Sequence, residues 1–456
     1  MKIPFNPKLK GLQKALNKSL YAVGGCVRDF ILSGKLSKDV DLTANLSVEE
    51  LSFAAKEVGF KVVSVNPSTM SVVFTDGEVV YEWTSFRREK YLGNGFHTPV
   101  SVERTDSIDE DALRRDFRCN ALYYNVADDT IYDCVGGLAD IQNKQLNTVR
   151  APRITFEEDG LRLLRLARFC GELGFDIGKQ TLDGARAFAK NVLAISHERV
   201  FLELKRMLMA DTAHSFSLKD GHYRAFKALD EISVLDIILP ELTLGRGMSQ
   251  RKKWHNHDVL EHSLRTILYA DQSVRLAALL HDIGKPEQML KTGSYHGHDM
   301  VGAILAKSVL TRFNADKATV YEVCRLVGLH MLDLEGDMSV KKLRRVFVEN
   351  ADIFEKLLLL KQADFKAGRD CDEVSPSIAK WRTVYADMLA ENVPWSIKDL
   401  KISATELMEL GLVGAQIGDF LKEAHKICIT RPTENDRDKL VKRAKNFLNK
   451  KSTNIL

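Results

Sequence analysis

The sequence predicts a multidomain α+β protein, with a small mixed sheet in an N-terminal head and all-helical domains after it. Two observations predict this division. Residues 1–148 contain short runs rich in β-branched and aromatic side chains, such as SLYAVGG and MSVVFTDGEVVYEWTSF, with turn residues between them. From about Thr155 the apolar residues recur at helical spacing, as in FEEDGLRLLRLARFCGELGF. We therefore expect domains at residues 1–148, 149–245, 246–372 and 373–456.

Composition indicates a soluble protein that stays in the cytoplasm. The formal net charge of +4 neither requires nor excludes a nucleic-acid partner. The seven cysteines are scattered without a CxxC pair, which indicates reduced thiols in the cytoplasm. No apolar run approaches the roughly 18 residues of a membrane span, so we expect no membrane partner. The sequence leaves the oligomeric state open.

The first motif of the head is Gly24-Gly25-Cys26-Val27-Arg28, directly after the β-run Leu20–Val23. A strand that runs into two glycines and then a helix brings bare backbone close to a phosphate chain, and the helix amides face the anion. Arg28 would add a charge-assisted hydrogen bond to a triphosphate. Taken alone, the same pattern is also typical of a structural turn.

The second motif places two carboxylates, Asp39 and Asp41, two residues apart in the run Lys38–Leu42. Residues i and i+2 of a strand point to the same face. Both can stay ionised if cations offset their repulsion, which favours Mg²⁺ bound together with substrate phosphates. Two such metals can activate a 3′-hydroxyl and stabilise a leaving pyrophosphate. A solvated strand edge is the alternative, and Glu82 is a candidate third carboxylate.

The third motif is Arg114-Arg115-Asp116-Phe117. Its arginines would bind phosphate or ribose from the far wall of a cleft, or they would form a salt-bridge cluster at a helix end.

The fourth motif is Glu158-Asp159-Gly160-Leu161-Arg162, which Arg165 and Arg168 continue in steps of three. Asp159 and Arg162 would share a helix face. Asp accepts from an exocyclic amine and Arg donates to ring acceptors, as in base recognition generally. A weak salt bridge on a solvated helix is the alternative.

A separate pattern of histidines and aspartates occupies residues 255–364. Because neighbouring side chains on a helix diverge, adjacent His281 and Asp282 meet one metal only at a helix end or a local distortion. Imidazole and carboxylate ligands suit a divalent transition metal such as Mn, Ni, Fe or Zn. His298 and His330 would complete a second site or contact phosphate. The expected inner ligands are His262, His281, Asp282 and Asp364.

In their order and spacing, the four motifs of residues 20–230 resemble the bacterial and eukaryotic class of CCA-adding tRNA nucleotidyltransferases and their relatives, the bacterial poly(A) polymerases. This resemblance implies a polymerase-beta-like catalytic head, then a neck that carries the nucleotide-selecting helix. Residues 255–364 are similar to the HD superfamily of phosphohydrolases. The tail resembles the tRNA-binding tail of bacterial CCA enzymes, with Gly411, Gly414 and Gly418 punctuating two short helices and basic residues at its end.

The resemblance also implies roles for the motif residues. Asp39 and Asp41 carry the Mg²⁺ ions, and Asp159 and Arg162 select CTP or ATP as a protein template. The family usually has a small hydroxyl residue after RRDF, where this chain has Arg118. Residues 90–111 are long enough for the flexible loop that separates full CCA enzymes from CC-adding ones, or they form a surface hairpin. The expected nucleotide contacts are Gly25, Arg28, Arg115, Asp116, Asp159, Arg162, Arg165 and Arg168.

The leading interpretation is addition of CCA to the 3′ end of tRNA from CTP and ATP, with release of pyrophosphate. The HD region would add a phosphohydrolase activity, for example on a 2′,3′-cyclic phosphate of RNA. Alternatives within the class are a CC-adding or A-adding enzyme or a poly(A) polymerase, although those polymerases typically lack an HD domain and end in a strongly basic extension. Alternatives of another class are an HD phosphohydrolase with an RNA-binding transferase-like half and a non-catalytic RNA-binding protein. Intact Asp39, Asp41, Asp159 and Arg162 argue against the first of these. A non-catalytic RNA-binding protein would need neither metal constellation.

Overall fold

The computed structural model describes residues 2–250 and 256–453. The chain divides into two compact units. The first comprises Met1–Met248 and Lys307–Val320, and the second comprises Ser249–Ala306 and Tyr321–Leu456. Helices α16 (His298–Arg312) and α17 (Lys317–Leu329) contribute residues to both units. The finer predicted boundaries at residues 148, 245 and 372 stay predictions.

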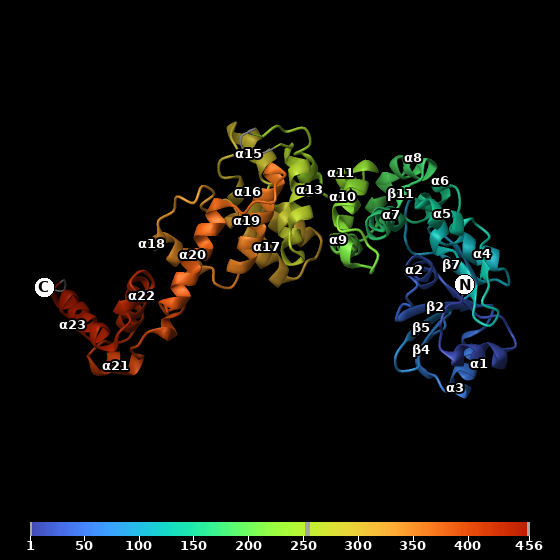
Figure 1. The fold of residues 1–456 in the computed structure, drawn as a ribbon, viewed down its shortest axis with the longest axis horizontal. Coiled ribbons are helices and arrows are strands. Elements are labelled where there is room, and N and C mark those ends of the chain that lie inside the picture. The colour runs from blue at the N-terminus through green and yellow to red at the C-terminus, as the bar shows by residue number, and fades with distance from the viewer. Residues whose placement is uncertain (1, 251–255, 454–456) are drawn as a thin grey trace. The chain divides into compact units, whose positions relative to one another are not determined.

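A seven-stranded mixed sheet forms the head of the first unit (Figure 1). The order of neighbouring strands is β3-β4-β5-β2-β1-β8-β9. Strands β2 and β5 run parallel and the other neighbours run antiparallel, so the predicted mixed sheet is confirmed. The strands are β1 (Tyr21–Val23), β2 (Asp39–Ala44), β3 (Lys61–Asn66), β4 (Ser71–Thr75), β5 (Val80–Ser85), β8 (Tyr123–Asn125) and β9 (Ile131–Tyr132).

Alternation along β2 separates a core face from a polar face. Val40 and Leu42 are buried, while Asp39 and Asp41 point to the opposite face. Helix α3 (Val48–Glu57) packs against β3 and β4. Its neighbour is α1 (Pro7–Leu16), and α2 (Gly25–Ser33) joins β1 to β2. The polar face of β2 is therefore left free to line a site.

A two-stranded hairpin follows the sheet, formed by β6 (Arg87–Lys90) and β7 (Ser101–Arg104). Residues 91–100 join its two strands, and the two interpretations of residues 90–111 stay predictions. The chain then enters α4 (Ile108–Leu113), which begins where the side chain of Ser107 accepts from the backbone N–H of Glu110.

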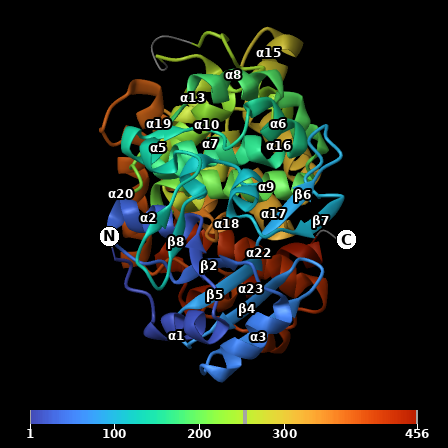
Figure 2. The same ribbon diagram turned by 90° about the vertical axis from the view of Figure 1, so that its right-hand side faces the viewer.

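The helical part of the first unit is built around α7 (Leu161–Leu173), of which only Arg165 is not buried. Helix α7 packs against α9 (His197–Leu208) and α10 (Gly221–Glu231), which appear above strands β2, β4 and β5 in Figure 2. The short parallel pair β10 (Gln145–Leu146) and β11 (Asp176–Ile177) lies beside it. The other helices are α5 (Gly137–Asn143), α6 (Pro152–Glu158), α8 (Lys179–Ala187), α11 (Leu235–Ile238) and α12 (Pro240–Thr243).

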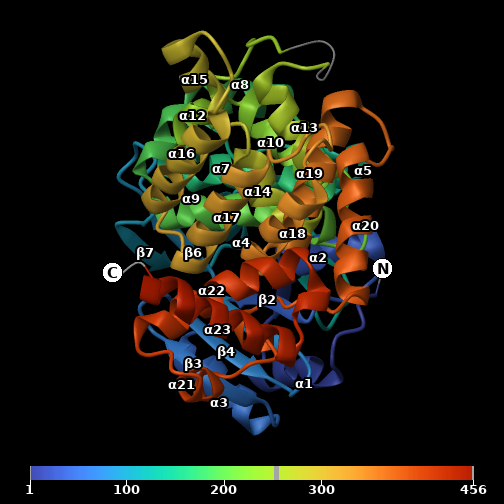
Figure 3. The same cartoon turned by 90° about the vertical axis from the view of Figure 1, so that its left-hand side faces the viewer.

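The second unit is all-helical where the structure describes it (Figure 3). Helix α13 packs against α14 and α19 and so brings distant parts of the chain together. Among the described residues, no helix is both long and apolar enough to cross a membrane. The helices before the tail, besides α16 and α17, are α13 (Val259–Tyr269), α14 (Arg275–Leu280), α15 (Lys285–Thr292), α18 (Val340–Glu349), α19 (Phe354–Arg369) and α20 (Pro376–Ala390).

The tail has its own small core, in which Leu407, Phe420 and Leu440 are buried. Its helices are α21 (Ala404–Glu409), α22 (Ala415–Thr430) and α23 (Arg437–Thr453). Gly411 and Gly414 punctuate the chain between α21 and α22 as expected, but Gly418 lies inside α22, where the prediction of a break is wrong. A helix fixed by tertiary packing tolerates one interior glycine at a cost of about 1 kcal/mol. The basic side chains at 450–451 lie outside the described ones.

Candidate functional site

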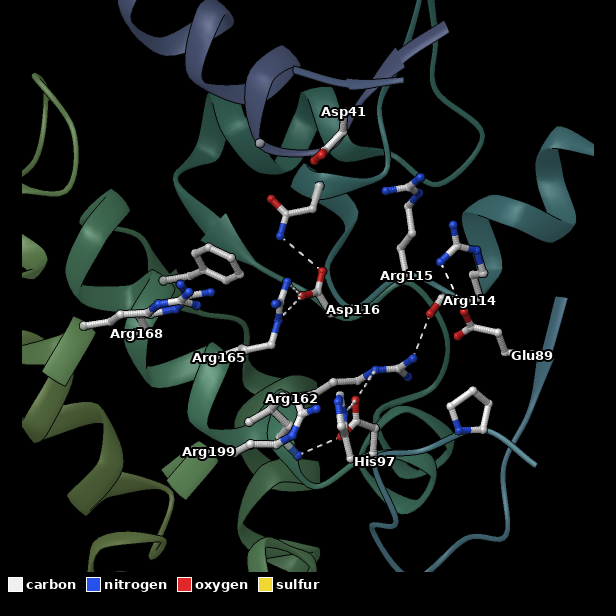
Figure 4. A pocket seen from close by; sticks show the side chains of 18 of the residues that line it. Asp41, Glu89, His97, Arg114, Arg115, Asp116, Arg162, Arg165, Arg168 and Arg199 are labelled. Atoms are coloured by element: carbon white, nitrogen blue, oxygen red, sulfur yellow. Dashed lines mark hydrogen bonds and ion pairs between the residues drawn. The ribbon is translucent and has the colours of Figure 1, made fainter. Parts of the chain in front are cut away.

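One cleft in the first unit gathers all four head and neck motifs (Figure 4). Its volume is about 1100 Å³. Each of the ten residues expected to bind Mg²⁺ or nucleotide lines it: Gly25, Arg28, Asp39, Asp41, Arg115, Asp116, Asp159, Arg162, Arg165 and Arg168.

The paired carboxylates of β2 face this cleft with a third carboxylate beside them. Glu82 on β5 lies directly opposite Asp41 in the parallel register. Burial raises the pKa of Asp41, and the nearby Glu82 and Asp39 raise it further, while Arg115 opposes them. A divalent cation relieves the repulsion between carboxylates on one face of a sheet, so this donor set fits Mg²⁺.

The glycine pair lies against these carboxylates. Gly24 has φ of +80°, and a Cβ on it would lie 3.1 Å from Asp41 Oδ2. Gly25 begins α2, and a Cβ there would meet Arg28 Nη2 only at an ordinary 3.5 Å. The stricter requirement for glycine therefore falls on Gly24 rather than on the predicted contact residue Gly25.

Asp111, which sequence analysis missed, holds the two arginines of the third motif. It is fully buried and accepts from Arg114 Nε at 2.8 Å, Arg115 Nη2 at 3.2 Å and Tyr123 Oη at 2.7 Å. Burial raises the pKa of Asp111, but the two arginines and Tyr123 overcome burial and hold the pKa at about 2. The spacing D-x-x-R-R at a helix end is the signal that would have found this residue.

Asp116 connects two walls of the cleft. Its Oδ2 accepts from Arg165 Nε at 2.7 Å and Nη2 at 2.6 Å. Its Oδ1 accepts from Asn120 Nδ2 at 3.1 Å, and Asn120 Oδ1 accepts from Arg28 in turn. Burial raises the pKa of Asp116, but Arg165 and Asn120 overcome burial and hold the pKa at about 2. Motifs that are far apart in the sequence thus share one buried polar network.

The expectation that Asp159 and Arg162 share one helix is wrong. Helix α6 ends at Glu158 and α7 begins at Leu161, with Asp159 in an extended conformation between them. Asp159 Oδ1 accepts from the Leu161 N–H at 2.8 Å, and this local bond competes with a continuous helix. Asp159 Oδ2 still lies 3.8 Å from Arg162 Nε, so the pair remains adjacent in the cleft.

A second cluster, of metal-ligand type, lies in the second unit. Helix α14 ends at Leu280 and α15 begins at Lys285, so His281 and Asp282 occupy the turn between helices that their adjacency requires. His262 of α13 brings its Nε2 within 2.9 Å of Asp364 Oδ1 and 3.2 Å of His281 Nε2. The four expected ligands therefore converge.

Asp282 connects this group to two further histidines. Its Oδ2 lies 3.2 Å from His281 Nε2, while its Oδ1 lies 3.1 Å from His298 Nε2 and 3.5 Å from His330 Nε2. The Nδ1 of each of these histidines lies 2.7–2.8 Å from the carbonyl oxygen three residues earlier, which directs the Nε2 lone pair into the cluster. Burial lowers the pKa of His330, which favours the neutral form that binds metal. This donor set fits divalent transition metals.

Comparisons with known proteins agree with this geometry. Residues 20–147 match the Poly A polymerase head domain, residues 174–244 the probable RNA and SrmB-binding site of polymerase A, and residues 259–364 the HD domain. The multifunctional CCA protein of Thioalkalivibrio sulfidiphilus is 30% identical, over 88% of this chain and 95% of its own. The chain belongs to the tRNA nucleotidyltransferase family. The resemblance inferred from the four motifs is confirmed.

Two relatives of this nucleotidyltransferase are named for different products. The A-adding tRNA nucleotidyltransferase of Deinococcus radiodurans is 30% identical over 76% of each chain. The CC-adding enzyme of Thermus thermophilus is 28% identical over 89% of this chain and 88% of its own. These identities are too similar to select one product for this nucleotidyltransferase.

Solved structures show the same fold. The Bacillus stearothermophilus CCA-adding enzyme in complex with CTP superposes with a TM-score of 0.67 at 20% identity, covering 100% of both chains. The Thermotoga maritima CCA-adding enzyme in complex with tRNA gives 0.58 at 16% identity, covering 97% of this chain and 94% of its own. The predicted nucleotidyltransferase head, followed along the chain by helical domains, is confirmed.

This nucleotidyltransferase places further arginines in the cleft that sequence analysis missed. Arg199 and Arg206 of α9 both line it, and their spacing of seven residues, two helical turns, was a usable signal. Arg168 pairs with Glu203 at 3.0 Å. The unusual Arg118 does not line the cleft, and its Nε donates to the Thr148 carbonyl at 3.2 Å.

Proposed function

We propose that this nucleotidyltransferase adds CCA to the 3′ end of tRNA from CTP and ATP and releases pyrophosphate. The convergence of all ten expected residues on one cleft of about 1100 Å³ carries the proposal. That volume lies at the large end of ligand sites and suits a nucleoside triphosphate beside a primer end. The exposed Lys442 and Lys445 of α23 would contact the tRNA backbone.

Asp39 and Asp41 would hold Mg²⁺ on the polar face of β2. Two bound Mg²⁺ ions would lower the pKa of the primer 3′-hydroxyl and neutralise charge on the leaving pyrophosphate. The protein keeps both carboxylates on one face, and the absence of a side chain at Gly24 leaves room for the Asp41 carboxylate. Substituting either aspartate would therefore remove transfer chemistry without removing the RNA-binding surface.

Arginines would bind the triphosphate from the walls of the cleft. Arg115 is fixed by Asp111, and Arg165 is fixed by Asp116. Donors held in place before substrate binds stabilise developing negative charge without paying a reorganisation cost at the moment of reaction. Arg28 and Arg168 would extend this positive wall.

Asp159 and Arg162 would select the base. Cytosine and adenine both present an exocyclic amine that a carboxylate accepts from, and ring nitrogens that a guanidinium donates to. Uracil and guanine present a carbonyl oxygen at the corresponding position, and a carboxylate repels it. The pair therefore favours CTP and ATP over UTP and GTP.

The decisive experiment measures incorporation of labelled CTP and ATP, separately and together, into tRNA transcripts that end before CCA, after C and after CC. Ordered addition of C, C and A that then stops is the expected result. Addition of C alone or A alone would identify a partial enzyme. Open-ended addition of A would identify a poly(A) polymerase, and no incorporation would contradict the proposal.

A second candidate function is phosphoester hydrolysis in the HD region. The observation in its favour is the convergence of two metal-ligand groups, His262, His281 and Asp282 in one and Asp282, His298 and His330 in the other. Asp364 Oδ1 lies 2.9 Å from His262 Nε2. Bound divalent metal would activate water for attack on phosphorus. The test is hydrolysis of an RNA 2′,3′-cyclic phosphate with Mn²⁺, Ni²⁺, Fe²⁺ or Zn²⁺, compared with the chelated enzyme. Hydrolysis that needs added metal would support the candidate, and none with any metal would contradict it.

A further inference from the structure

The loop between β6 and β7 is bound to the turn that carries Asp159. The Gly95 N–H donates to the Glu157 carbonyl at 2.7 Å, and the Gly160 N–H donates to the Gly95 carbonyl at 3.0 Å. Gly95 has φ of +81°, and a Cβ on it would lie 2.4 Å from the Asn191 carbonyl oxygen. Only glycine fits there, so the two backbone hydrogen bonds depend on a glycine at position 95.

His97 follows this contact and reaches the Asp159 carboxylate. Its Nδ1 lies 3.1 Å from Asp159 Oδ2, while Asp159 Oδ1 accepts from the Leu161 N–H at 2.8 Å. Figure 4 shows His97 in the cleft, and both residues line it. The carboxylate is therefore held from two sides, and lone pairs remain for one more donor.

The same loop also contacts the partner of Asp159. The Arg162 guanidinium lies 5.6 Å from the centroid of the Tyr91 ring, and the Tyr91 hydroxyl donates to Glu89 at 2.6 Å. Arg162 Nη2 donates to the Arg114 carbonyl at 2.7 Å. Both members of the Asp159–Arg162 pair thus take part of their orientation from residues 91–97.

We propose that His97 is a positioning residue for nucleotide selection, which acts by holding the Asp159 carboxylate toward the base. This inference rests on the proposed base-selecting role of Asp159. With Oδ1 committed to the Leu161 N–H and Oδ2 to His97, the carboxylate has one orientation. The Asp159 carboxylate then accepts a hydrogen bond from an exocyclic amine without the entropy cost of ordering an acidic side chain.

The test compares three substitutions of His97. Asparagine places an amide N–H near the position of the imidazole Nδ1, glutamine places its amide one bond farther away, and alanine removes the donor. We expect His97→Ala to raise KM for CTP and ATP about tenfold, the order of the cost of ordering one side chain, and to change kcat less than about twofold. We also expect His97→Ala to incorporate more UTP and GTP. His97→Asn should restore both properties, and His97→Gln should not.

Two controls separate positioning from damage to the fold. His97 is partly exposed, so the variants should unfold at the same temperature as the parent enzyme. Lys90→Ala alters the same hairpin outside the cleft, and it should leave KM and selection unchanged. Unchanged KM and selection in His97→Ala, or equal rescue by glutamine and asparagine, would overturn the inference.

Asp159→Ala distinguishes this inference from the function it rests on. If Asp159→Ala keeps its discrimination against UTP and GTP, the base-selecting role fails. If Asp159→Ala loses discrimination and His97→Ala does not, only the role of His97 fails. We expect the double variant to discriminate no worse than Asp159→Ala alone, because His97 acts through that carboxylate.

Discussion

Gly24 lies directly against the carboxylate of Asp41, because a Cβ on Gly24 would be 3.1 Å from Asp41 Oδ2 in a backbone with φ of +80°. We expect Gly24→Ala to lower nucleotide addition to tRNA at least about tenfold and to reduce stability by about 1 kcal/mol, because it strains the backbone and displaces the carboxylate. Addition rates and urea denaturation measure the two effects. Gly34 also has positive φ but no neighbour within 4 Å, so Gly34→Ala should lose stability and keep its activity. Equal activity loss in both variants would contradict the contact with Asp41.

The carboxylate of Asp41 should be needed for chemistry and not for tRNA binding. We expect Asp41→Asn to abolish nucleotide incorporation while the tRNA dissociation constant stays nearly unchanged, because the amide no longer ligates Mg²⁺ as an anion. Incorporation of labelled CTP and a filter-binding titration with tRNA measure the two properties. The exposed Asp128 lies outside the cleft, and Asp128→Asn should retain both. Retained incorporation in Asp41→Asn would remove this residue from the metal site.

The buried Asp111 carboxylate predicts sensitivity to acid. Its pKa of about 2 lies below the ordinary value, so its stabilising effect is full above about pH 4 and is lost as the pH falls toward 2. At neutral pH, Asp111→Asn should destabilise the enzyme by roughly 3 kcal/mol, because two arginines lose their partner. Urea denaturation at pH 7 and between pH 4 and 2 measures both effects. We expect the variant to lose less stability than the parent in acid, and Glu78→Gln, at an exposed position, to behave like the parent.

The HD cluster should bind metal in two groups that share Asp282. We expect Asp282→Ala to lose metal from both groups, and His330→Ala to lose it from one, because His330 contacts only the Oδ1 side of Asp282. Metal analysis after dialysis measures the content. His296→Ala removes an exposed histidine nearby and should keep all of it. Equal loss in His330→Ala and Asp282→Ala would argue for one shared site.

Transfer and hydrolysis should also be separable. His281→Ala should lose any phosphohydrolase activity and still add nucleotides to tRNA, because His281 lies in the second unit and the cleft is lined by residues of the first. Parallel assays of one preparation measure both activities. If both fell together, the two sites would not be independent.

Local sequence patterns predicted the parts of the site that depend on spacing within one element. Asp39 and Asp41 share a face because a strand has a period of two. His281 and Asp282 had to lie at a helix end because adjacent helical side chains diverge, and they do. The helical spacing after Thr155 was real, but the break at Asp159 was missed, because an Asp side chain can bond to nearby backbone instead of continuing a helix.

The sequence by itself therefore determined the mixed sheet, the helical domains that follow it along the chain, the four motifs, and the histidine and aspartate cluster. These features follow from short-range periodicity and residue chemistry. Only the tertiary structure decided that Gly24 lies against Asp41 and that His97 reaches Asp159. The contacts of Gly24 and His97 join residues far apart in the chain. Their partners are chosen by packing and by the need to satisfy buried polar groups, which no local spacing records.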